Sequence, residues 1–247
     1  MIIKTDEEIQ IMKLAAELGS VCFEAAQAFL STNLRTDIKI TERLLAEFME
    51  GVAESFEEDY EGLSFPPIIA SGPNSAFPHA ELTDRVIQTG EFLTIDFGVM
   101  AHGFASDMTR TVFVGSGRGS DVSELSAKQK LVYDTVLKAQ LAGIASARPG
   151  VACKDLDKIV RDIIEEAGFG EHFLHTTGHG VGEEVHEAPR IGKEDETVLE
   201  ENMVVTIEPG IYIEGFGGVR IEDTVVITKE GCEIITIGGM PKELTII

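Results

Sequence analysis

Cysteine is scarce in this chain, and its three cysteines lie far apart. Cys22, Cys153 and Cys232 form no close pair and no Cys-x-x-Cys spacing. This pattern provides neither a disulfide framework nor the thiolate ligands of a structural zinc site. We therefore expect three small buried side chains in a reducing compartment.

Long apolar runs are also missing. No segment approaches the roughly 18 apolar residues of a membrane span. The first ten residues, MIIKTDEEIQ, lack the basic start and the apolar stretch of a secretory signal. We expect a cytoplasmic location and no membrane partner.

Basic residues are outnumbered by acidic ones. The 20 lysines and arginines face 43 aspartates and glutamates, which gives a formal net charge of −23. Such a charge repels phosphate backbones and anionic lipids, so we expect no nucleic-acid partner. Most of these acids are expected to lie on a solvated surface.

The order of predicted helices and strands indicates two similar halves in an ordinary globular chain of 247 residues. In the first half, Thr5 and Glu8 fit a capping box before a helix that runs to about residue 30. A second helix is predicted from near Thr41 to Ser55, and a short strand ends at Ala70. Residues 91–115, EFLTIDFGVMAHGFASDMTRTVFVG, then predict a β-hairpin.

The second half repeats this order. Ser126 with Gln129 opens a long helix that ends before Pro149, and another helix is predicted from about Lys154 to Ala167. Residues 202–228, NMVVTIEPGIYIEGFGGVRIEDTVVIT, predict a final hairpin. We expect an α+β fold in which duplicated αβ halves, about 1–120 and 121–247, form a curved, mainly antiparallel sheet with helices on its outer face.

Each predicted hairpin carries two acids. If the first turn is centred between Ala101 and His102, Asp96 and Asp107 lie directly opposite each other, about 5 Å apart at Cβ. If the second is centred on Gly215, Glu208 and Glu222 are also opposite.

Like charges in such positions destabilise a sheet, and two divalent cations would balance the four carboxylates. Any one of these acids alone would more often face water. The recurrence of the pairing in both halves favours a metal site.

Four histidines within fifteen residues add to this prediction: His172, His175, His179 and His186. Neutral imidazole is a transition-metal ligand and also titrates near neutral pH. Gly178 and Gly180 are expected to leave room for a ligand beside His179. We assign no role to His102 or His172.

Seven blocks in order, SGPNSAFPHA, TIDFG, SDMTRT, HTTGHGVG, VHEAP, TIEPGIY and GVRIED, resemble the signature blocks of the pita-bread metallopeptidases. That family includes methionine aminopeptidases, Xaa-Pro aminopeptidases and prolidases. The resemblance covers essentially the whole chain. It implies a pita-bread fold and a metallo-exopeptidase that hydrolyses the bond before proline in peptides.

The resemblance also implies the site residues. The ligands of two divalent ions would be Asp96, Asp107, His179, Glu208 and Glu222, with Asp107 and Glu222 bridging both ions. Glu208 would act as the catalytic base, assisted by His79, His175 and His186. Substrate-binding residues would be His79, His175, His186, Tyr212 and Arg220. Manganese or cobalt is the expected metal, with zinc as the alternative.

Two other functions stay open. A methionine aminopeptidase is one, although His175 and the fourteen-residue spacing from Glu208 to Glu222 resemble the Xaa-Pro branch more closely. A non-catalytic peptide-binding module is the other, although all five ligands are retained. The sequence reads as a single catalytic domain, residues 1–247, without the N-terminal domain usual in the Xaa-Pro branch. A homodimer is an open alternative.

Overall fold

Four α-helices occur in the part of the chain that the structure describes, as two sequential pairs, each followed by a long hairpin. The computed structural model describes residues 2–34, 36, 38–116, 121–238 and 242–247. In these ranges the α-helices are α1 (Asp6–Asn33), α2 (Glu42–Glu54), α3 (Ala127–Ser146) and α4 (Cys153–Glu166). Both predicted capping boxes are present, at Thr5 with Glu8 and at Ser126 with Gln129. No helix of the described ranges is long and apolar enough to cross a membrane.

Short elements complete the chain. The 3₁₀ helices are η1 (Glu57–Asp59), η2 (Gly72–Ala76), η3 (Val122–Glu124) and η4 (Gly170–His172). The strands of the first half are β1 (Gly62–Leu63), β2 (Ile68–Ser71), β3 (Phe92–Phe97), β4 (Val99–Ala101), β5 (Phe104–Ala105) and β6 (Met108–Phe113). Those of the second half are β7 (Gly178–Gly180), β8 (Glu187–Ile191), β9 (Val204–Ile207), β10 (Gly210–Ile213), β11 (Gly217–Arg220), β12 (Asp223–Ile227) and β13 (Cys232–Ile234).

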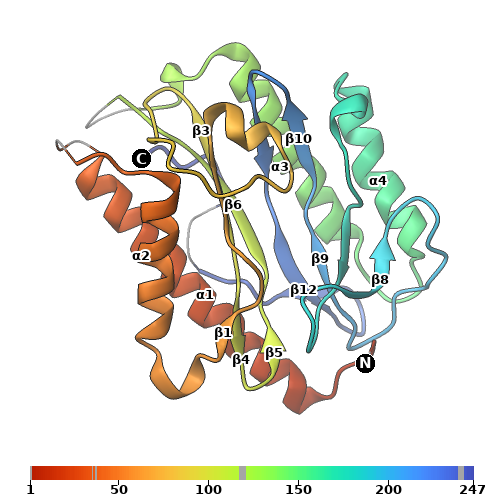
Figure 1. Ribbon diagram of the computed structural model, residues 1–247. Coiled ribbons are helices and arrows are strands. Elements are labelled where there is room, and N and C mark those ends of the chain that lie inside the picture. Colours follow the sequence, from red (N-terminus) through yellow and green to blue (C-terminus); the bar gives the residue numbers. More distant parts are fainter. Residues whose placement is uncertain (1, 35, 37, 117–120, 239–241) are drawn as a thin grey trace.

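The strands form antiparallel sheets, as predicted. Their orders are β2-β3-β6, β1-β4-β5, β10-β11 and β13-β12-β9-β7-β8. In Figure 1, α1 and α2 lie together beside the strands of the first half, and α4 lies on the far side beside β8. The three cysteines are free thiols, two of them buried and Cys232 half-buried.

Apolar and polar side chains alternate along the strands, which separates an apolar core on one face from a polar face on the other. In β3, Leu93 and Ile95 pack with Phe23 and Leu45 of α1 and α2. Thr94 and Asp96 therefore point to the opposite face of the strand, because side chains alternate. A second core joins α3 and α4 to β10 and β11. The helices thus cover the apolar side of the strands and leave the acids on the other side.

The first hairpin differs from its predicted register. Its turn is centred between His102 and Gly103, both at positive φ (46° and 81°), as a two-residue hairpin turn requires. Asp96 is consequently paired with Thr109 and not with Asp107. The predicted direct pairing is wrong by two residues. Because a two-residue shift preserves the face, Asp107 still lies on the same face as Asp96, in a diagonal position.

The second hairpin has the predicted register. Ile207 pairs with Asp223 on one side of the two glutamates, and Gly210 pairs with Arg220 on the other. Glu208 and Glu222 therefore lie directly opposite each other. The turn contains Gly215 at φ 73°, a conformation that glycine adopts without strain.

A buried ion-pair network joins the two hairpins behind the acids. Asp223 of β12 accepts from Arg110 of β6 at 2.7 Å and from Lys242 at 2.9 Å. Gln140 of α3 donates to the same carboxylate at 2.6 Å. Burial raises the pKa of Asp223, but Arg110 and Lys242 lower it below its ordinary value. The network fixes β12, and with it the adjoining Glu222, against β6.

We expect Asp223→Asn to lower the free energy of unfolding by about 3–5 kcal/mol, because the change removes a buried counter-charge from Arg110. Urea denaturation of the metal-free protein measures this value. Asp134→Asn is the control, because its ion pair with Lys130 on α3 is exposed, and such pairs contribute about 0.5 kcal/mol. Equal losses in both variants would contradict a structural role for the network.

Candidate metal centre

Nine of the ten predicted site residues line one cavity of about 1540 Å³. They are Asp96, Asp107, His179, Glu208, Glu222, His79, His175, His186 and Arg220. The tenth, Tyr212, lies directly behind the wall, where its hydroxyl group contacts His175 and Arg220. The two hairpins and the loops that precede them therefore bring together residues from both halves of the sequence.

Three of the predicted ligands form a group that could hold a metal ion. Asp107, His179 and Glu222 each offer a ligand atom, and these atoms lie within 4.8 Å of one another. Asp107 and Glu222 are almost fully buried. Burial raises the pKa of both carboxyl groups well above their ordinary values, and neighbouring carboxylates raise them further.

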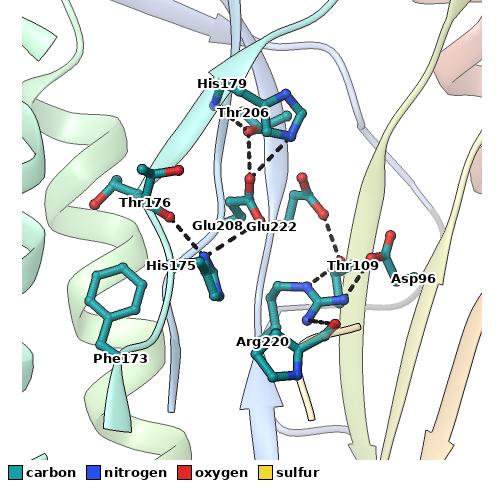
Figure 2. A network of polar contacts seen from close by, with 12 residues as sticks. Asp96, Thr109, Phe173, His175, Thr176, His179, Thr206, Glu208, Arg220 and Glu222 are labelled. Carbon is teal, nitrogen blue, oxygen red and sulfur yellow. Dashed lines mark hydrogen bonds and ion pairs between the residues drawn. The ribbon is translucent and has the colours of Figure 1, made fainter. Parts of the chain in front are cut away.

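Glu208 joins this group through His179. The Nε2 atom of His179 lies 3.2 Å from Oε1 of Glu208 and 3.7 Å from Oδ2 of Asp107. Burial raises the pKa of Glu208, but the hydrogen bond and charge of His179 outweigh burial and lower the pKa to about 2. Figure 2 shows Glu208 directed toward His179, with Glu222 beside it.

Asp96 lies at the other end of the acid cluster. Its Oδ2 atom accepts a hydrogen bond from Arg220 at 2.6 Å. Its Oδ1 atom is buried and has no hydrogen-bond partner in the described part of the chain. A buried carboxylate oxygen without a donor is costly, and a bound cation would satisfy it.

The donor set fits divalent cations. Four carboxylates and one imidazole provide mostly oxygen ligands with a single nitrogen, which suits manganese, cobalt or zinc. The raised pKa values of Asp107 and Glu222 also fit a cation at this point, because buried like charges disfavour ionisation until a cation neutralises them. The residues therefore fit the metal centre that the sequence predicted.

The glycines beside His179 have a different role from the predicted one. A Cβ atom on Gly178 would collide with the backbone of Thr206, and one on Gly180 with the backbone of Ala188. These glycines allow close packing of β7 against neighbouring strands and do not provide space for a ligand. The backbone N–H of His179 donates to the Thr206 hydroxyl at 3.0 Å, which fixes the imidazole beside Glu208.

A second polar chain borders the acids. Nε2 of His175 lies 2.8 Å from the Tyr212 hydroxyl, which accepts from Arg220 at 2.8 Å. Because Arg220 also bonds Asp96, this chain connects a predicted substrate-binding histidine to a predicted metal ligand. Burial lowers the pKa of His175, so that burial favours a neutral imidazole.

The remaining histidines differ in whether they line the cavity. The His186 ring lies 4.4 Å from the His179 ring, and His79 lines the same cavity from the η2 loop. His102 instead contacts Asp59 in an exposed turn, and His172 packs near Phe169. Neither of the last two lines the cavity.

Two threonines at the site were not predicted. The Thr109 hydroxyl donates to Glu222 at 2.6 Å and accepts from Arg220 Nε at 3.1 Å. The Thr206 hydroxyl donates to Glu208 at 3.1 Å. Strand alternation provided a signal, since each threonine lies two residues from an acid and therefore on the same face.

Helix pairs on one side of antiparallel hairpins, with four acids and a histidine on the opposite, polar face, define the pita-bread fold, which a class of metallopeptidases shares. Residues 10–229 match metallopeptidase family M24, and the chain belongs to that family.

Relatives of this chain include Xaa-Pro dipeptidases and an X-Pro aminopeptidase. The chain is 44% identical over 235 residues to an Xaa-Pro dipeptidase of Pyrococcus furiosus, covering 95% of this chain and 63% of that protein. The solved structure of an Xaa-Pro dipeptidase from Bacillus anthracis superposes with a TM-score of 0.89 at 43% identity, covering 100% and 64% of the two chains. An X-Pro aminopeptidase from Thermotoga maritima gives 0.86 at 38% identity, covering 100% and 65%. The chain thus spans less than two thirds of the length of these relatives.

We expect added Mn²⁺ to raise the melting temperature by about 5–10 °C at 100 times its Kd. The gain should be larger near pH 7.5 than near pH 5.5. The pKa values of Asp107 and Glu222 are raised in the folded state. This shift stabilises the fold fully when the pH is below the pKa values of the unfolded chain, which are about 4. The stabilisation is lost as the pH rises through the folded-state pKa values. Bound cations offset that loss of stability. Scanning fluorimetry with and without Mn²⁺ at both pH values measures the rise in melting temperature.

Asp107→Asn should reduce both the metal-induced gain and its pH dependence. Glu214→Gln changes the net charge equally in the exposed turn of the second hairpin and serves as the control. Identical curves for the two variants would argue against a cation at this cluster.

Proposed function

We propose that residues 1–247 act as one catalytic domain that hydrolyses the bond before proline in Xaa-Pro peptides. The convergence of the four acids with His179 beside His79, His175 and His186 is the observation that carries this proposal. The names of the Pyrococcus and Bacillus relatives support the same substrate class.

In this proposal, Asp96, Asp107, His179, Glu208 and Glu222 would hold two divalent ions. Such ions, when bound, lower the pKa of water and polarise the scissile carbonyl group. Glu208 would accept the proton of the attacking water and pass it to the leaving nitrogen. His186 and His79 would donate hydrogen bonds to the developing oxyanion and to the peptide main chain.

Selection of proline would depend on its ring and its tertiary amide. The nitrogen of the bond before proline is part of the proline ring and carries no hydrogen, so a pocket that offers no acceptor for an N–H group at this point favours proline. Apolar side chains also line the cavity: Phe65, Pro66, Pro67, Leu82 and Leu174. His79, His175 and Arg220 would border the substrate, with Tyr212 holding the latter two from behind.

The physiological setting is part of the proposal. Manganese or cobalt would occupy this oxygen-rich site, with zinc as the alternative. The enzyme would act on peptides in the cytoplasm, without a nucleic-acid or membrane partner. A homodimer is compatible with this function.

A peptide panel tests the proposal. The protein, loaded in turn with Mn²⁺, Co²⁺ and Zn²⁺, is assayed on Xaa-Pro dipeptides, Xaa-Pro-Xaa tripeptides and Met-Ala-Ser. We expect turnover of the proline peptides and release of the residue before proline, measured by chromatography. A preference for Met-Ala-Ser would establish a methionine aminopeptidase instead. Metal binding and peptide binding without hydrolysis of any peptide would indicate the non-catalytic module.

We expect Glu208→Gln to lower kcat by about 10²–10⁴-fold, because the change removes the proposed base while nearly preserving its shape. Metal analysis of the same preparation should show weaker retention of one ion. Glu214→Gln, an exposed substitution in the same hairpin, should retain full activity. Near-normal turnover by Glu208→Gln would remove Glu208 from the mechanism.

A further inference from the structure

Two residues of α4 form a buried ion pair at the wall of the cavity, which Arg161 lines and Asp157 does not. Asp157 and Arg161 meet through two hydrogen bonds of 2.9 Å each, from Nε and Nη2 to the two carboxylate oxygens. The Asp157 side chain is 1% exposed and that of Arg161 is 10% exposed. Burying such a pair stabilises a fold no more than an apolar pair of similar volume would. Its partners therefore indicate what the pair does.

These partners all belong to the segment that carries His175. The backbone N–H and the hydroxyl of Thr177 both donate to Asp157 Oδ1, at 3.2 and 2.9 Å. Arg161 donates to the carbonyl oxygens of His175 at 3.0 Å and Phe173 at 3.3 Å. Its guanidinium group also lies over the Phe173 ring, 4.2 Å from the centroid. Three alternate residues of one segment are thus held by one ion pair.

The segment in turn contacts the proposed base. The backbone N–H of Glu208 donates to the Thr177 carbonyl oxygen at 2.8 Å. Figure 2 shows His175 between Phe173 and Glu208, with the imidazole directed into the site. A displacement of this segment would therefore move both His175 and the backbone of Glu208.

The first half contains a matching arrangement. Glu42 of α2 is fully buried, and one of its oxygens accepts both the N–H and the hydroxyl of Ser71 at 2.8 Å. Its other oxygen accepts from Asn74 and Thr83. These contacts hold the loop that carries His79. In each half, the second helix thus provides one buried carboxylate to a loop with a cavity-lining histidine.

We propose that Asp157, supported by Arg161, is a positioning residue that fixes the segment Phe173–Thr177 so that His175 and Glu208 face the bound peptide. The inference rests on the peptidase function proposed above. Asp157 itself does not line the cavity, so it acts through the residues that it holds.

Asp157→Asn retains the shape of the side chain but weakens its bonds to Arg161 and Thr177. We expect kcat on an Xaa-Pro dipeptide to fall by about 10–100-fold, while the bound metal per chain stays unchanged. Thr177→Val, which removes only the hydroxyl donor, should give a smaller loss in the same direction. Unchanged kcat in both variants would overturn the proposal.

A control variant is available on the same helix. Asp162 pairs with Lys158 at the same four-residue spacing, but the two side chains are 47% and 69% exposed. Asp162→Asn should therefore leave kcat and metal content unchanged. A loss equal to that of Asp157→Asn would show a general effect on α4 and overturn the positioning role.

A double-mutant comparison separates positioning from simple destabilisation. In a His175→Ala background, Asp157→Asn should cost a smaller fold-change in kcat than in the native background, because part of what it positions is already gone. The same fold-change in both backgrounds would overturn the proposal.

Amide hydrogen exchange provides a readout without turnover. In Asp157→Asn, peptides covering residues 173–178 should exchange at least about ten times faster than in Asp162→Asn, as expected for local opening. Equal exchange in the two variants would overturn the proposal that Asp157 fixes this segment. If Asp157→Asn exchanges faster but the native protein cleaves no Xaa-Pro peptide, Asp157 still fixes the segment, and the proposed function is rejected.

Discussion

The repulsion among four clustered carboxylates, three buried and one half-buried, is the constraint on which the rest of this structure depends. Arg220 partly neutralises Asp96, and His179 partly neutralises Glu208. Asp107 and Glu222 keep strongly raised pKa values, and no cationic side chain of the described residues forms an ion pair with Glu222. Positive charge at this point would therefore relieve the repulsion, and divalent cations would supply that charge.

The surrounding scaffold holds these repelling groups together. Asp223 with Arg110 fixes the second hairpin against the first, directly beside Glu222. Asp157 and Glu42 attach histidine-bearing loops to the helices of each half. Each of these carboxylates is buried and receives several hydrogen bonds. The energetic cost of assembling the centre is thus offset by interactions on the helix side of the sheet.

Local signals account for the parts of the fold that were predicted correctly. Capping boxes located the starts of α1 and α3, and the glycine at 215 set the register that pairs Glu208 with Glu222. The first hairpin was misplaced because His102 adopts a positive φ that a residue other than glycine rarely takes. Asp107 nevertheless lines the same cavity as Asp96, because a two-residue shift leaves it on the same face of the sheet.

The sequence by itself determined the elements, the family resemblance and the set of acids and histidines, because these depend on spacing and residue type along the chain. Only the tertiary structure decided the contacts between distant segments. Arg220 bonds Asp96 across 124 positions, Tyr212 lies behind the cavity wall, and Gly178 serves strand packing. Nothing in local periodicity encodes such contacts, because they arise only when two hairpins and two helix pairs pack together.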